Sequence, residues 1–253
     1  MRFTKGHGTG NDFIIVDESV ELSPDFVAAL CDRRFGVGGD GVLRVAREGS
    51  LHFMDYWNSD GSIGEMCGNG VRVFARYLFE NGLAEGPSVK VATRAGVRTA
   101  FLEGDDIRVD MGPPLVVGRS WARSGGVSYE GVSVSMGNPH LVCEVKSVAP
   151  LDLSVAPEFD KEFFPDGVNV EFMEGVGDRH VRMRVYERGS RETMSCGTGA
   201  VAVGFVALDG ALGSVTVDVP GGRLAVSVDE TTSWLAGPAV LTFSGQLSPG
   251  FDA

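Results

Sequence analysis

The chain has 253 residues, a formal net charge of −12, 43% hydrophobic residues and 22% charged residues. This length allows one large domain or two smaller ones, and the composition is that of a soluble globular protein. Because the charge is acidic and no lysine- or arginine-rich run occurs, we expect no binding to nucleic acid or to anionic membranes. No segment is apolar for long enough to act as a signal peptide or to span a bilayer, so we expect a cytoplasmic protein.

The first part of the chain is predicted to contain a loop at 5–12, a strand at 13–16 and a helix that begins at Ser23. Serine is a good capping residue, and the proline and aspartate that follow it suit a first helical turn. Residues 36–41 read GVGGDG, which matches the dinucleotide-binding pattern G-x-G-x-x-G. That pattern needs a strand before it and a helix after it, whereas here a helix precedes and a strand follows. We therefore interpret residues 36–41 as a turn.

A strand at 51–57 leads into a polar, glycine-rich loop, and Cys67 follows this loop directly. Apolar residues then recur at helical spacing, namely Val71, Phe74, Ala75 and Leu78. Cys67 is therefore predicted at a helix N-terminus, where unpaired N–H groups and the helix dipole favour a thiolate. The glycines after it allow a bound anion to approach the backbone closely.

The rest of the chain is predicted to be rich in strands, at 88–93, 97–102, 107–111, 132–136, 141–145, 167–172 and 181–186. Residues 150–164 are the least regular stretch, with a short helix predicted at 154–159. The segment 187–199 then repeats the cysteine loop, since Glu187 precedes Cys196 by nine residues, as Asn58 precedes Cys67. The helix that follows, at 200–208, is apolar all round, so we expect strands to enclose it.

The duplication extends beyond the two cysteine loops. Segment 10–17 matches 137–144, 89–91 matches 215–217, and 112–113 matches 237–238, all at offsets between 125 and 129 residues. A repeat of half the chain predicts two similar domains related by a pseudo-two-fold axis. We therefore predict an α/β fold of the α+β type. Each domain would be a curved, mostly antiparallel sheet wrapped around a central helix, with the active site in the interdomain cleft. The predicted domains are 1–116 plus 243–253, and 117–242.

Four cysteines are present, but they do not form a metal-binding or disulfide pattern: Cys31, Cys67, Cys143 and Cys196. None belongs to a Cys-x-x-Cys pair, so we predict no metal site and a reducing compartment. We interpret Cys31, in an amphipathic helix, and Cys143, in an apolar strand, as small buried hydrophobes. The matched pair, Cys67 and Cys196, suggests a reaction that needs two thiols.

Two thiols on opposite sides of one carbon can invert a stereocentre. A thiolate removes a proton from one face and a thiol returns a proton to the other, which is general acid–base catalysis next to a carboxylate. Mutual repulsion favours a state in which only one of two interacting groups is ionised. Backbone amides at 68–70 and 197–199 are placed to stabilise the carboxylate as charge develops, and domain closure would exclude water.

Other interpretations explain only half of the repeat. A redox pair would be closer in sequence, as in thioredoxin-like proteins. A Cys–His nucleophile that uses His140 or His7 leaves the second cysteine without a role. A redox or thiol-regulated binding protein remains the alternative from another functional class.

At these residues the sequence resembles the diaminopimelate epimerase family, whose members do not use pyridoxal phosphate. The matching blocks span nearly the whole chain: 7–13, 58–62, 67–70, 137–140, 168–169, 187–189 and 196–200. The resemblance implies cofactor-independent epimerisation of LL-2,6-diaminopimelate to the meso form, for lysine and peptidoglycan synthesis, by a homodimer. It also implies that a last strand, at 241–247, returns to the first domain. A relative that acts on another amino acid, such as a histidine racemase or a hydroxyproline epimerase, is the runner-up.

The resemblance also implies roles for individual residues. Cys67 and Cys196 would be the acid–base pair, and His140 would support the site. The substrate contacts would be Asn11, Asn58, Gly68, Asn69, Asn138, Asn169, Glu187, Arg188, Gly197 and Thr198. The planar guanidinium of arginine suits a carboxylate, and asparagine or glutamate can accept from an ammonium group. These contacts favour a substrate with a second amino-acid head. Gly41 stands where some relatives carry a glutamine that contacts the substrate, and glycine has no side chain to make that contact.

Overall fold

The computed structural model describes residues 1–251. The chain divides into two compact units, one formed by Met1–Val109 with the segment from Gly237 onward and the other by Asp110–Ala236. Each unit is a mixed sheet that packs around one central helix, so the predicted α/β fold with two similar halves is confirmed. The domain boundaries expected after residues 116 and 242 stay a prediction, because a compact unit is not by itself an independently folding domain.

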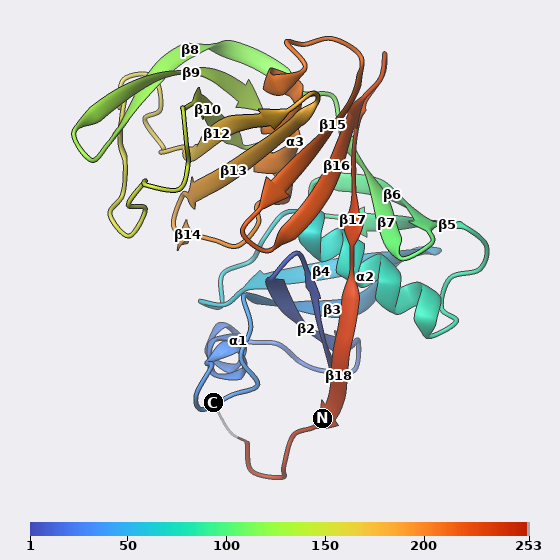
Figure 1. Cartoon of the computed structure of the whole chain (residues 1–253). Helices are drawn as coiled ribbons and strands as arrows, with labels where there is room; N and C mark the ends of the chain where they lie inside the picture. Colours follow the sequence, from blue (N-terminus) through green and yellow to red (C-terminus); the bar gives the residue numbers. More distant parts are fainter. Residues whose placement is uncertain (252–253) are drawn as a thin grey trace. The chain divides into compact units, whose positions relative to one another are not determined.

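In the first unit the strands pair in the order β18-β1-β2-β3-β4-β5-β6-β7 (Figure 1). Their bounds are β1 (Arg2–Gly8), β2 (Asn11–Asp17), β3 (Gly41–Glu48), β4 (Leu51–Asn58), β5 (Ser88–Thr93), β6 (Gly96–Glu103), β7 (Asp106–Gly112) and β18 (Val240–Gln246). The pairs β2–β3 and β4–β5 are parallel, and the other pairs are antiparallel. The pairing of β18 with β1 confirms that the last strand returns to the N-terminal half.

The second unit repeats this arrangement with the order β8-β9-β10-β12-β13-β15-β16-β17. Its main strands are β8 (Leu115–Ser124), β9 (Val127–Ser135), β10 (Pro139–Glu144), β12 (Asn169–Gly177), β13 (His180–Glu187), β15 (Gly213–Val219), β16 (Gly222–Val228) and β17 (Ser233–Pro238). The parallel pairs, β10–β12 and β13–β15, occupy the same places in the order as in the first unit. The internal repeat is therefore a repeat of sheet topology as well as of sequence.

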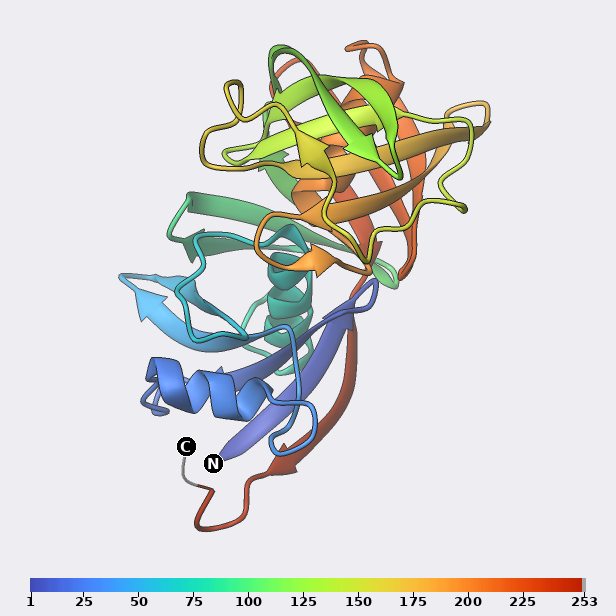
Figure 2. The same ribbon diagram turned by 90° about the vertical axis from the view of Figure 1, so that its left-hand side faces the viewer.

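Each sheet packs around its own helix. Helix α2 (Gly68–Glu80) contacts β1 to β6 and β18, and α3 (Gly197–Ala207) contacts β9, β10, β12, β13, β15 and β16. Figure 2 gives a second view, in which strands of the second unit surround α3. The residues of α3 from Gly197 to Gly204 are all buried, which confirms the prediction for this all-apolar helix.

A third helix, α1 (Pro24–Cys31), begins as predicted, because the Ser23 hydroxyl accepts a hydrogen bond of 3.2 Å from the Phe26 N–H. Cys31 and Cys143 are buried in the cores of their units, as expected for small hydrophobes, and burial raises the pKa of each thiol to about 12. None of the helices described is both long and apolar enough to cross a membrane.

The prediction of a loop at 5–12 was wrong for most of that segment. Strand β1 pairs with β2 on one side and β18 on the other. The glycines in β1 concealed the strand pattern, but Gly6 is needed there because a Cβ would lie 2.9 Å from the Val240 carbonyl oxygen. The hairpin turns at Thr9 and Gly10, which have φ values of 50° and 82°. This hairpin places Asn11 at the first position of β2.

The helix predicted at 154–159 was also wrong. Glu158 and Phe159 instead form β11 (Glu158–Phe159), which pairs with β8. Strand β8 itself was not predicted, because its first residues, Leu115, Val116 and Val117, are exposed and show no alternation. In both places pairing with a distant strand decides the structure, and local sequence preference does not.

Candidate active site

Cys67 and Cys196 occupy the same structural position in the two units. Each is the N-cap of the central helix, with backbone angles (φ, ψ) of −139° and 119° for Cys67 and −112° and 116° for Cys196. Each sulfur accepts a hydrogen bond of 3.4 Å from the N–H three residues later, that of Gly70 or Gly199. Cysteine thus takes a position that serine, threonine, aspartate or asparagine usually holds. The predicted placement of both thiols at helix N-termini is confirmed.

The predicted carboxylate-binding residues form the first turns of these helices. Gly68 and Asn69 begin α2, and Gly197 and Thr198 begin α3. The first N–H groups of an α-helix have no carbonyl partner within the helix, and the helix dipole adds partial positive charge there. Each thiol therefore lies beside a turn that can receive an anion.

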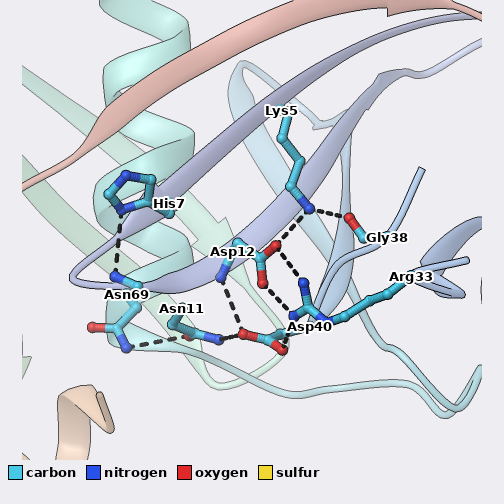
Figure 3. A network of polar contacts seen from close by, with 9 residues as sticks. Lys5, His7, Asn11, Asp12, Arg33, Gly38, Asp40 and Asn69 are labelled. Carbon is cyan, nitrogen blue, oxygen red and sulfur yellow. Dashed lines mark hydrogen bonds and ion pairs between the residues drawn. The ribbon is translucent and has the colours of Figure 1, made fainter. Parts of the chain in front are cut away.

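In the first unit the structure brings Asn11, Cys67 and Asn69 together. The Cys67 Sγ lies 3.6 Å from Asn11 Oδ1 and donates to it, and Asn69 Nδ2 donates to the same oxygen at 3.2 Å. Asn11 comes from the start of β2 and Asn69 from the first turn of α2, so the contact joins the hairpin to the helix (Figure 3).

Asn58 lies outside this hydrogen-bonded group. The Tyr56 hydroxyl donates to Asn58 Oδ1 at 2.7 Å, and Asn58 Nδ2 donates to Ser62 Oγ at 2.9 Å. Both ends of the amide are thus engaged in the loop that precedes Cys67. In the described structure Asn58 ends β4 and its side chain holds the loop that follows.

In the second unit a continuous chain of polar contacts runs from Glu171 to Cys196. His140 Nδ1 lies 2.6 Å from Glu171 Oε1, and His140 Nε2 lies 3.0 Å from Asn138 Oδ1. Asn138 Nδ2 donates to Thr198 Oγ1 at 3.4 Å, and this oxygen lies 3.6 Å from Cys196 Sγ. His140, expected to support the site, is fully buried and connects two elements of it.

Asn169 contacts Arg188 at its backbone N–H and not at its guanidinium. Asn169 Nδ2 donates to the Pro139 carbonyl at 2.9 Å, and Asn169 Oδ1 accepts from the Arg188 N–H at 2.9 Å. The Arg188 guanidinium donates to the Asp166 carbonyl at 3.1 Å, while Glu187 Oε1 accepts from the Thr193 hydroxyl. Asn169 thus fixes the backbone from which Glu187 and Arg188 project.

The two thiol sites differ in what lies beneath the first helical turn. By strand register, Phe13 and Leu43 of the first unit correspond to His140 and Glu171 of the second. All four side chains are completely buried. An apolar pair in one unit is therefore replaced by a polar pair in the other. Glu171 was missed in the sequence, although a lone glutamate within an apolar strand was a signal for it.

These surroundings keep Cys196 protonated. Burial is the largest cause that raises the pKa of the Cys196 thiol well above its usual value, and the charges of Glu187 and Glu171 raise it further. Hydrogen bonds from Thr198 and Gly199 act in the opposite direction and do not prevail. Burial also raises the pKa of Glu171, although His140 opposes that shift.

Replacing Glu187 with glutamine is expected to lower the pKa of the Cys196 thiol. The substitution removes a negative charge that destabilises the thiolate, so the thiol ionises at lower pH. The rate of alkylation of the Cys196 peptide, followed by mass spectrometry over a range of pH, measures this. Glu192→Gln is the matched control, because Glu192 lies between Glu187 and Cys196 in the chain but pairs with Arg184 of β13. If the pH midpoint of Cys196 alkylation were the same in the wild type and in Glu187→Gln, the charge of Glu187 would not raise the pKa of Cys196.

Known proteins resemble this chain over nearly its whole length. The sequence profile of the diaminopimelate epimerase family matches residues 3–117 and 132–242. A diaminopimelate epimerase of Mycolicibacterium smegmatis is 46% identical, with 98% of this chain and 97% of the relative aligned. One from Thermobifida fusca is 48% identical, with 98% of each chain aligned.

Solved structures share the fold at lower sequence identity. A hydroxyproline epimerase from Agrobacterium vitis superposes with a TM-score of 0.74 at 15% identity, covering 97% of this chain and 91% of that one. A phenazine biosynthesis protein from Bacillus anthracis gives a TM-score of 0.73 at 18% identity, covering 98% and 99%. These similarities concern the fold alone. The two matched stretches and the nearly full-length relatives establish that the chain belongs to the diaminopimelate epimerase family.

Proposed function

We propose that this protein epimerises LL-2,6-diaminopimelate to meso-diaminopimelate, with Cys67 and Cys196 as the acid–base pair at one α-carbon. The observation that carries the proposal is the shared N-cap geometry of the two thiols in two units of the same topology. Relatives named diaminopimelate epimerase, at 46% and 48% identity over nearly the whole chain, support the choice of substrate.

The proposed reaction moves two protons and changes no oxidation state. One thiolate takes the α-proton, so a C–H bond breaks, an S–H bond forms and the electron pair stays on the α-carbon and its carboxylate. The other thiol then gives its proton to the opposite face, so an S–H bond breaks and a new C–H bond forms. In the reverse direction the two sulfurs exchange roles. Each turnover leaves the opposite thiol ionised.

We assign Cys196 as the thiol that gives a proton and Cys67 as the sulfur that takes the α-proton from LL-diaminopimelate. Burial and two nearby carboxylates raise the pKa of Cys196, which suits a proton donor. Cys67 is half-buried and has the guanidinium of Arg72 nearby on α2. Burial lowers the pKa of Arg72 to about 10, and the charge of Cys67 opposes this shift. A buried cation near the sulfur stabilises a thiolate.

The first helical turns supply the stabilisation that deprotonation at carbon needs. The α-carbon of an amino acid is a weak acid, so catalysis depends on donors aimed at the carboxylate where negative charge develops. We assign this role to Gly68 and Asn69 in α2 and to Gly197 and Thr198 in α3.

The remaining assigned substrate contacts fall into two groups. Asn11 and Asn138 belong to the polar contacts around the thiols. Asn58 ends β4, Asn169 begins β12, Glu187 ends β13 and Arg188 follows it. We assign to these four residues the second amino-acid head of the substrate. A cytoplasmic location and a homodimeric state complete the proposal, and both depend on the family.

A comparison of substrates tests the proposed function. LL-Diaminopimelate, L-histidine and trans-4-hydroxy-L-proline are each incubated with the protein, and the configuration of the α-carbon is followed by chiral chromatography. We expect inversion of diaminopimelate alone, because only this substrate offers an amino-acid head to both groups of residues. Inversion of histidine or hydroxyproline without inversion of diaminopimelate would refute the substrate assignment.

A further inference from the structure

A cluster of ion pairs lies beside Asn11 (Figure 3). Arg33 binds Asp12 through both Nη atoms, at 3.0 and 2.7 Å, and its Nη2 also lies 2.7 Å from Asp40 Oδ1. Lys5 Nζ pairs with Asp12 Oδ2 at 2.6 Å. These residues come from β1, β2, the turn after α1 and the residue before β3. None of them has a role in the proposed reaction.

Asp40 belongs to the segment 36–41 that resembles a dinucleotide-binding loop. In the structure the segment is a turn between α1 and β3, as its surroundings in the sequence predict. A Cβ at Gly36 would lie 2.2 Å from the Ala29 carbonyl oxygen, and Gly38 has a φ of +82°. These glycines let the turn fold tightly against α1. The result is that Asp40 reaches the start of β2.

Asp40 determines which way the Asn11 amide points. Asp40 Oδ2 accepts hydrogen bonds from Asn11 Nδ2 at 2.8 Å and from the Asp12 N–H at 3.1 Å, while Oδ1 accepts from Arg33. An ionised carboxylate can only accept, so Asn11 must turn its NH2 group toward Asp40. Its carbonyl oxygen then faces the Cys67 sulfur and the Asn69 amide.

We propose that Asp40 is a positioning residue for Cys67, because it holds the Asn11 carbonyl oxygen against the sulfur. The S–H group then has a fixed acceptor, which sets its direction and stabilises the protonated state. The Gly70 N–H donates to the same sulfur and stabilises the thiolate. A sulfur that alternately takes and gives a proton thereby has a partner in each state. The catalytic meaning of this arrangement rests on the function proposed for Cys67.

In the second unit no carboxylate occupies the position of Asp40. Strand register matches Gly41 with Asn169, so the position of Asp40 is taken by Val168, which is buried. Asn138, the counterpart of Asn11, turns its NH2 group toward Thr198 and its oxygen toward His140. The two equivalent asparagines therefore present opposite ends of their amides to the thiol sites.

Asp40 accepts from Asn11, from the Asp12 N–H and from Arg33, as an ionised carboxylate does. Burial acts to raise the pKa of Asp12, but hydrogen bonds from Arg33 and Lys5 outweigh it and lower that pKa. Burial and the charge of Asp12 raise the pKa of Asp40, whereas the Asn11 hydrogen bond lowers it. Arg33 and Lys5 thus balance two carboxylates. The buried guanidinium of Arg72 is a further charge near Cys67 in this unit.

Asp40→Asn is expected to lower the pH midpoint of Cys67 alkylation by about one unit, a size usual for one changed neighbour. The new amide no longer requires an NH2 group opposite it, so Asn11 can turn its own NH2 group to the sulfur. Alkylation of the Cys67 peptide is followed by mass spectrometry, with the Cys196 peptide as internal reference. Asp12→Asn is the matched control, because it neutralises the same cluster without a bond to the Asn11 side chain. We expect no shift for this control.

A double-mutant cycle separates positioning from simple charge. Asn11→Ala alone is expected to lower the pH midpoint of Cys67 alkylation. Adding Asp40→Asn to Asn11→Ala should lower that midpoint no further. The proposal would be overturned if Asp40→Asn lowered the pH midpoint of Cys67 alkylation equally in the wild type and in Asn11→Ala. It would also be overturned if Asp12→Asn lowered that midpoint as much as Asp40→Asn does. If Asp40→Asn does not fold, as judged by circular dichroism, an unchanged midpoint in Asn11→Ala overturns it. Alkylation needs no substrate, so failure to epimerise diaminopimelate would refute the proposed function independently.

Discussion

Replacing Cys67 or Cys196 with alanine is expected to reduce epimerisation by about 10³- to 10⁴-fold in each case. Loss of one positioned acid or base typically costs 10²–10⁴-fold, and no other group near either sulfur is assigned to carry the proton. The effect is expected to be the same size for both cysteines, because every turnover uses one to remove and the other to deliver a proton. Initial rates of formation of meso-diaminopimelate measure the loss.

The other two cysteines provide the control for this prediction. Cys31 and Cys143 are buried in the cores of the two units and cap no helix. Cys31→Ala and Cys143→Ala should cost stability through the lost packing but retain most of the turnover. A Cys67→Ala or Cys196→Ala variant with nearly full activity would refute the two-thiol mechanism.

Gly199→Ala is expected to destabilise the protein, whereas the equivalent Gly70→Ala should leave its stability intact. A Cβ on Gly199 would lie 2.6 Å from Glu171 Oε1 and 3.3 Å from the Cys196 sulfur. Glu171 is completely buried and held by His140, so it cannot move aside without disturbing the polar chain that leads to Cys196. Overpacking of this kind costs about 1–3 kcal/mol of stability. Displacement of Cys196 should also reduce epimerisation.

At Gly70 the same Cβ meets only ordinary contacts. Its nearest neighbours would be the Cys67 Cβ at 3.4 Å, Leu43 at 3.5 Å and Phe13 at 3.6 Å. Alanine also favours the helix over glycine by about 0.5–1 kcal/mol, so Gly70→Ala should not destabilise the protein. Denaturant unfolding and initial rates of epimerisation compare the two variants. If Gly70→Ala and Gly199→Ala reduced stability equally, the buried His140–Glu171 pair would not restrict the second helix more than the apolar pair restricts the first.

The parts of the site that depend on local pattern could be predicted from the sequence. The position of Cys67 before an amphipathic helix, and the equal spacing from Asn58 and from Glu187, are visible in the chain itself. They predicted the helix N-termini and the two similar halves. The all-apolar pattern of α3 likewise predicted its burial, because a helix without a polar face has no side to expose.

The parts that depend on distant contacts could not be predicted. Strands β1 and β8 show little alternation, and they form because other strands pair with them. The importance of Asp40 follows from the packing of a turn against a hairpin 28 residues earlier in the chain. Asp40 and the Asn69 amide together set the direction in which the Asn11 amide points. Spacing along a chain does not contain such information.

The isotope content of the first product formed in D₂O tests the central claim most directly. Thiols exchange their protons with solvent, so with two thiols on opposite faces the new hydrogen comes from a sulfur that carries deuterium. We expect every meso-diaminopimelate molecule formed from LL-diaminopimelate to contain one deuterium at the inverted carbon from the first turnover. Meso product that retains the substrate's own hydrogen at that carbon would contradict the claim, because a single base would then have carried the proton from one face to the other.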